Sequence, residues 1–190
     1  IDSSVIEALD AGLAAYEGKA LINSMTGEDE RMDAILPLVK KYDAAILALP
    51  NDETGIPMTA DERMPIVEKI VRRVEKEGIP LENLLIDPLA MPVGAEPEAV
   101  KQTLETMYRV REKYGLNMSI GASNVSFGLP NRHALNAAFM PMAMSMGLTS
   151  AIMDGRTKEV VQSVRAADLL LALDAWGGNW ITNFRESKSE

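Results

Sequence analysis

Short apolar runs alternate with longer amphipathic patterns along almost the entire chain, and this alternation restricts the possible folds more than any other feature. Strands separated by helices favour parallel pairing through helical crossovers. The sequence therefore predicts an α/β fold in a single domain over residues 1–190. We expect strands at 19–23, 43–49, 84–87, 117–121 and 150–153, and helices at 3–17, 28–41, 59–78, from about 97 onward, 132–146 and 158–173.

Several helix ends carry local signals. Thr59 and Glu62 have the spacing of a capping box, and Gly78 suits the end of the same helix. The segment 183–190 shows no clear pattern. The other expected N-terminal caps are Ser3 or Ser4 for the first helix, and Thr26 and Asp29 for the second.

Charge and composition exclude several classes of function. The chain has 19 Lys and Arg against 28 Asp and Glu, a net charge of −9, which opposes binding to nucleic acid or to an anionic membrane surface. It has no cysteine, which excludes disulfides and thiolate chemistry and fits a cytoplasmic location. No membrane-spanning run or signal peptide is visible. Because the chain opens at Ile1 and not at a methionine, we expect residues upstream.

Polar side chains stand where the predicted strands end. Each could simply cap a helix or shape a turn. In parallel α/β folds, however, ligands bind at the carboxyl ends of the strands. Five such residues together therefore favour a binding site at this edge. They are Asp2, Asn23, Asp87, Asn124 and Asp154.

Most familiar catalytic motifs are absent. No glycine-rich loop for a dinucleotide or a nucleoside triphosphate follows a strand, and this also disfavours S-adenosylmethionine. The only histidine, His133, stands at an expected helix start, where a capping or surface role is the ordinary interpretation. No clustered ligands indicate a metal site.

The remaining polar residues suit a neutral heterocycle. A carboxylate such as Asp87 can accept hydrogen bonds from an amino group and the adjacent ring N–H, the edge that guanine and pterin rings present. Asparagine offers both a donor and an acceptor for a mixed edge. Such a pocket discriminates by leaving groups unpaired when the wrong ring enters.

Five segments carry a resemblance to a known family: Leu21–Ser24, Ile86–Leu89, Gly121–Arg132, Leu135–Phe139 and Gly147–Leu148. Together they resemble the pterin-binding methyltransferases, which include the methyltetrahydrofolate:corrinoid protein methyltransferases and the folate domain of cobalamin-dependent methionine synthase. The resemblance implies a dihydropteroate-synthase-like TIM (β/α)8 barrel. It places Asp2 at the end of the third strand and makes the five predicted strands the fourth to eighth, so roughly the first three βα units are lacking.

The resemblance also implies roles for individual residues. Asp2, Asn23 and Asp87 would hydrogen-bond the pterin ring, and Ser123 and Arg132 would shape the pocket. Asn124 would lie near N5 and donate a hydrogen bond there, with Asp87 and water relaying the proton. Both are therefore the expected catalytic residues. The implied substrate is methyltetrahydrofolate or a related tetrahydropterin, and the implied partner is a corrinoid (cobalamin) protein, with the direction of methyl transfer left open.

Two other functions remain open. Dihydropteroate synthase shares the barrel and the pterin pocket, but its seventh-strand motif carries cations where this chain reads Ser123-Asn124-Val125. A pterin-binding protein without catalysis is the other alternative. The stretch Phe127–Pro130 is closer to methionine synthase and to methyltransferases of anaerobic demethylation systems than to some corrinoid-protein methyltransferases.

Two apolar features remain near the C-terminus. Met140, Met142, Met144 and Met146 occupy two faces of one expected helix, which predicts buried core or a subunit interface, as in a homodimer. Trp176 and Trp180 follow the last expected helix. For them we expect packing that closes the barrel bottom or a dimer contact.

Overall fold

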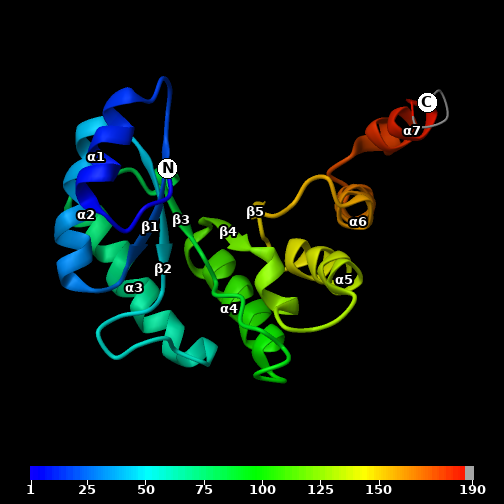
Figure 1. Ribbon diagram of the computed structural model, residues 1–190, viewed down its shortest axis with the longest axis horizontal. Coiled ribbons are helices and arrows are strands. Elements are labelled where there is room, and N and C mark those ends of the chain that lie inside the picture. Colours follow the sequence, from blue (N-terminus) through cyan, green and yellow to red (C-terminus); the bar gives the residue numbers. More distant parts are fainter. Residues whose placement is uncertain (187–190) are drawn as a thin grey trace.

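A computed structural model describes residues 1–186 and contains one five-stranded parallel sheet with the strands in sequence order (Figure 1). Sequential order with parallel pairing requires a crossover between every two strands, and helices supply it. The expected α/β architecture is confirmed. The strands are β1 (Leu21–Thr26), β2 (Ala45–Leu49), β3 (Leu84–Ile86), β4 (Asn117–Gly121) and β5 (Ser150–Ile152).

Helices α1 and α2 flank β1 and β2, and α6 and α7 lie at the far end of the molecule from them (Figure 1). The α-helices are α1 (Ile6–Ala15), α2 (Asp29–Tyr42), α3 (Ala60–Lys76), α4 (Ala99–Tyr114), α5 (Arg132–Ser145), α6 (Lys158–Leu170) and α7 (Gly178–Glu186). Short 3-10 helices are η1 (Leu81–Asn83), η2 (Ala122–Ser126) and η3 (Ala175–Gly177).

Alternation along the strands separates the core from the face that can hold a ligand. In β2, Ile46 and Ala48 belong to the hydrophobic core under the helices, so Leu47 and Leu49 point to the opposite face. Asn23 pairs in register with Leu47, and Asp87 directly follows the core residue Ile86. Asn23 and Asp87 therefore share the face that the helices leave uncovered.

The cap signals were confirmed at one helix only. Thr59 and Glu62 form the complete capping box of α3, each side chain bonding the other residue's backbone N–H. The N-caps of α1 and α2 are Val5 and Glu28, neither with a side-chain cap bond, so the expected serine, Thr26 and Asp29 caps are wrong. The reason at α2 is a tertiary one, because Glu53 of a distant loop accepts the backbone N–H of Asp29 at 2.8 Å.

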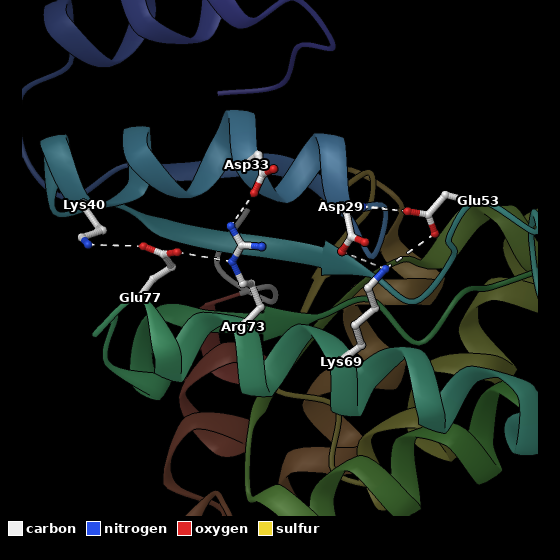
Figure 2. Close-up of polar contacts among 7 residues, drawn as sticks. All are labelled: Asp29, Asp33, Lys40, Glu53, Lys69, Arg73 and Glu77. Carbon is white, nitrogen blue, oxygen red and sulfur yellow. Dashed lines mark hydrogen bonds and ion pairs between the residues drawn. The ribbon is translucent and has the colours of Figure 1, made fainter.

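Ion pairs join α2 to α3 along their length (Figure 2). Lys69 on α3 lies 3.1 Å from Asp29 and 3.6 Å from Glu53. One turn further, Arg73 pairs with Asp33 of α2 and, at 3.3 Å, with Glu77, which also lies 3.4 Å from Lys40. These partly exposed pairs fix the relative position of the two helices that follow β1 and β2 more than they add to stability. The residues of this network are Asp29, Asp33, Lys40, Glu53, Lys69, Arg73 and Glu77.

The C-terminal segment differs from expectation. Helix α7 extends to Glu186 and so covers the first part of the segment 183–190, in which the sequence shows no clear pattern. Residues 187–190 lie outside the described residues. Trp176 is 99% exposed and Trp180 is 39% exposed, so the expected packing at the barrel bottom is wrong for Trp176. Of the α5 methionines, Met140 is buried in the core and Met142 is exposed, because α5 offers only one face to the sheet. A homodimer contact stays a prediction.

Candidate functional site

The first part of the site is formed where the N-terminus pairs with β1. Asp2 forms a parallel bridge with Asn23, and the amide nitrogen of Asn23 donates to the Asp2 carboxylate at 3.3 Å. The guanidinium of Arg31, from α2, donates to the carbonyls of Ser4 (3.1 Å) and Ser24 (3.5 Å) and so ties the two segments together. These residues line a cleft of about 380 Å³. A carboxylate, an amide and a cation thus face one opening.

Asp87 occupies the end of β3 as the sequence predicts. Its backbone N–H donates to the carbonyl of Ala48, which holds it in the sheet, and its carboxylate accepts the N–H of Leu89 at 2.8 Å. Burial raises the pKa of Asp87 to about 6, while the hydrogen bond from Leu89 and the charge of Arg63 act in the opposite direction. A carboxyl that titrates near neutrality can accept or release a proton under physiological conditions.

The third part is η2, which directly follows β4 and holds Ser123 and Asn124. The side chain of Asn124 is exposed and lies over Gly121, where a Cβ would stand 3.0 Å from its amide nitrogen. Glycine at this position therefore leaves the space that the Asn124 amide occupies. The amide is free to contact a ligand above the end of β4.

Arg132 holds the η2 segment in place. Its guanidinium donates to the carbonyl of Ser123 at 2.7 Å and to the hydroxyl of Ser126 at 3.1 Å. The amide of Asn136, one turn further along α5, donates to the Ser123 hydroxyl at 3.4 Å. Asn136 lies in the segment 135–139 that carries the family resemblance, but it was not predicted as a site residue. In this arrangement Arg132 acts on the loop backbone, which positions Ser123 and Asn124 over the strand ends.

Two further polar residues of the sequence analysis are Asp154 and His133. Asp154, after β5, pairs with its neighbour Arg156 at 2.9 Å, which lowers its pKa to about 2. His133 is exposed on the first turn of α5, in line with the expected surface role. Within residues 1–186, no three histidine or acidic side chains are grouped to hold a metal ion. None of the helices in this part of the chain is both long and apolar enough to cross a membrane.

The structure corrects the expected strand end at Asn23. β1 continues to Thr26, so Asn23 lies inside the strand. After an irregularity at Ser24, Met25 and Thr26 go on pairing with β2. A Cβ on Gly27 would stand 2.5 Å from Ile66. Thr26 of β1 pairs with Leu49 of β2, and the preceding residue of β2, Ala48, pairs with Ile86 of β3. Thr26 is therefore at the same level along the sheet as Asp87, the residue after Ile86.

Three side chains near the strand ends were not predicted as site residues, although Thr26 was expected as a helix cap. Thr26 ends β1 and Asn51 follows β2. The Thr26 hydroxyl and the side-chain carbonyl oxygen of Asn51 are buried without a hydrogen-bond partner among residues 1–186. Arg63, on α3, is fully buried. Its signal was present in the sequence, because Arg63 shares helical spacing with Val67, Ile70 and Val74 and so falls on the buried face.

Comparison with known proteins identifies the family. The family model described as pterin binding enzyme matches residues 1–154. The chain belongs to the pterin-binding enzymes. It is 31% identical, over 99% of its length and 70% of the relative's, to a methylcorrinoid:tetrahydrofolate methyltransferase of Eubacterium limosum. It is 32% identical over 80% of its length to the methionine synthases of Mycobacterium leprae and Mycobacterium tuberculosis, of which it spans 14%.

Solved structures of this pterin-binding fold agree with the predicted class. A dihydropteroate synthase of Yersinia pestis with a pterine-sulfa conjugate superimposes with a TM-score of 0.68 at 18% identity, over 90% of this chain and 67% of that one. A dihydropteroate synthase of Coxiella burnetii with pteroic acid gives 0.57 at 17% identity, over 90% and 74%. The fold is the dihydropteroate-synthase-like TIM barrel, of which the described residues contain five parallel strands. Identity this low supports the fold alone.

Proposed function

We propose that this pterin-binding protein transfers a methyl group between N5 of methyltetrahydrofolate, or of a related tetrahydropterin, and the cobalt of a corrinoid carried by a partner protein. One observation carries the proposal: similarity to a named methylcorrinoid:tetrahydrofolate methyltransferase extends over 99% of the chain. We also propose that the protein is cytoplasmic and forms a homodimer.

The site offers groups that match a pterin. Asp87 would accept hydrogen bonds from the amino group and ring N–H of the pterin, and its carboxylate lies on the same face of the sheet as Asn23. Asp2, bonded to Asn23, would extend the polar edge. These three residues bind and orient the ring. Ser123 and Arg132 would hold the loop above it.

The chemistry requires one well-placed donor. When N5 loses its methyl group, the C–N bond breaks, its electron pair stays on N5, and N5 takes a proton, while the cobalt(I) lone pair forms the new bond to the methyl group. The side-chain amide of Asn124 would donate to N5 as this charge develops. A donor of this type contributes about 10²–10³ in rate in other enzymes. Asp87, with a pKa of about 6, can hold or release the proton that reaches N5 through water.

A dihydropteroate synthase activity is the second candidate, and the structural neighbours favour it only at the level of the fold. A substrate with a pyrophosphate needs cationic side chains free to bind it. In this chain the position expected for those cations is Asn124 and Val125, and Arg132 is engaged by the carbonyl of Ser123 and the hydroxyl of Ser126. We therefore favour methyl transfer.

Two measurements test the proposal on the complete protein. Calorimetric titration with methyltetrahydrofolate should show binding, and absorbance of cob(I)alamin should report methyl transfer. Asn124→Ala should lower the transfer rate by about 10²–10³-fold. The control His133→Ala removes an exposed side chain of the adjacent helix and should leave both measurements unchanged. Absence of pterin binding by the folded protein would refute the proposal, and binding without transfer would favour the non-catalytic alternative.

A further inference from the structure

Arg63 is a cation in a place where apolar side chains are the rule. Its side chain is fully buried in the first turns of α3, and the positions that share its face are Val67, Ile70 and Val74. Burying a guanidinium is unfavourable unless its charge and its N–H groups find partners. An apolar residue would fill this position more simply, so the contacts of Arg63 indicate what it provides.

Two of its nitrogens donate hydrogen bonds to the backbones of two different loops. The Nε atom donates to the carbonyl of Pro57 at 3.1 Å, and Nη1 donates to the carbonyl of Pro88 at 2.9 Å. Pro57 belongs to the loop that connects β2 to α3, and Pro88 directly follows Asp87. Arg63 thus joins the β2–α3 loop to Pro88, the neighbour of Asp87, which we propose binds the pterin. Its Nη2 atom has no partner among residues 1–186.

The second contribution of Arg63 is electrostatic. The hydrogen bonds of Arg63 go to backbone carbonyls, so its charge acts on the Asp87 carboxylate without a direct ion pair between them. Burial favours the neutral form of Asp87, and the Arg63 charge and the N–H of Leu89 favour the ionised form. The carboxylate of Glu62, the residue before Arg63, favours the charged form of Arg63. Arg63 is therefore the cation that opposes the neutralisation of Asp87.

We propose that Arg63 is a positioning residue for Asp87: it fixes the backbone that carries this carboxylate and keeps the carboxylate ionised, so that Asp87 can accept two hydrogen bonds from a pterin. The identity of the ligand rests on the proposed function. The coupling of Arg63 to Asp87 does not, because it also exists in the protein without ligand. A protonated carboxyl presents a donor where the pterin also presents donors, so loss of the charge weakens recognition.

Two variants separate the contributions of charge and geometry. Arg63→Met removes both, and Arg63→Lys retains the charge, although a single ammonium group cannot reproduce the planar fork. Arg72→Met is the matched control, because Arg72 lies on the exposed side of the same helix. Each variant is made with Asp87 and with Asp87→Asn. The readouts are the affinity for methyltetrahydrofolate by calorimetry and, without ligand, the pH titration of the Asp87 carboxyl by 13C NMR.

We expect Arg63→Met to weaken binding at pH 7 by about 10- to 100-fold and to move the Asp87 titration to higher pH. Arg63→Lys should restore the titration and only part of the affinity. In the Asp87→Asn background, Arg63→Met should change affinity by less than about threefold, because the carboxylate it serves is gone. Should Arg63→Met fail to fold, Arg63→Gln, which is uncharged and can still donate to one carbonyl, replaces it.

Different failures have different meanings. Equal losses of affinity in both backgrounds, with an unchanged Asp87 titration, would overturn the inference and leave Arg63 a purely structural residue. If the unmodified protein bound no pterin, the proposed function would fail, while the NMR titration would still decide whether Arg63 acts on Asp87. An unchanged titration in Arg63→Met would then refute the coupling itself.

Discussion

Replacing Asp87 by asparagine should make the protein more stable at neutral pH, at the expense of its proposed binding function. In the folded protein, burial raises the pKa of this carboxyl from 3.8 to about 6. Asparagine is nearly the same size, carries no charge, and its carbonyl oxygen can still accept the N–H of Leu89. The substitution therefore isolates the effect of burying the charge.

The sign and the size follow from the two pKa values. Between pH 4 and pH 6 the folded state retains a proton that the unfolded chain has already lost, so the free energy of unfolding falls as the pH rises through this window. The difference between a pKa of 3.8 and one of about 6 corresponds to about 3 kcal/mol in the free energy of unfolding. Because the Asp87 side chain is partly accessible to solvent, the expected effect is somewhat smaller. Relative to the unmodified protein, Asp87→Asn should gain about 2–3 kcal/mol between pH 4 and pH 7.

Urea unfolding of both proteins at pH 4, 5, 6 and 7 measures this difference. Asp154→Asn is the control, because the pKa of Asp154 is lowered to about 2 and its charge does not change over this range. The difference between the Asp87→Asn and unmodified curves should widen with pH and level off above about pH 6. If the two curves run parallel from pH 4 to pH 7, the reasoning from burial is wrong. Methyltetrahydrofolate affinity should show the opposite trend: it should rise through pH 6 in the unmodified protein, and in Asp87→Asn it should be lower and should not rise over this range.

Three further changes test separate parts of the structure. Thr59→Ala removes the capping box of α3 and should cost about 1 kcal/mol in urea unfolding, whereas Thr59→Ser should keep most of it. Gly121→Ala places a Cβ 3.0 Å from the Asn124 amide nitrogen and should slow methyl transfer about tenfold or more with little loss of pterin affinity. Equal losses in both would contradict a role confined to the reacting atom. Arg132→Lys loses the fork that binds Ser123 and should lower the transfer rate, and an unchanged rate would show that the loop needs no such anchor.

Much of the fold could be predicted from local patterns. The apolar runs at 43–49, 84–87 and 117–121 became β2, β3 and β4, and the capping box at Thr59 and Glu62 marked the start of α3. These elements follow from hydrophobic periodicity and from contacts within one turn of helix. The α2 start was not predictable in this way, because its donor is capped by Glu53 from another loop.

The candidate site could be predicted only in part. Asp87 was predicted because it directly follows an apolar strand, and Asn23 was predicted although its expected strand ended too early. Their binding roles stay predictions. Thr26 was expected only as a helix cap and Asn51 was not considered, since their position relative to Asp87 depends on strand register, which a single sequence does not fix. The exposure of Trp176 was also beyond prediction, because apolar side chains carry no information on which surface will cover them.

The sequence by itself determined which residue types are available at the strand ends, and hence the carboxylate and amide chemistry of Asp87 and Asn124. It also determined the alternation that makes a parallel sheet, because both depend on residues close together in the chain. Only the tertiary structure decided that Arg63 binds the backbone next to Asp87 and that burial raises the pKa of this carboxyl. Desolvation and charge interactions depend on neighbours in space, and Arg63 and Asp87 become neighbours only when α3 packs beside the end of β3.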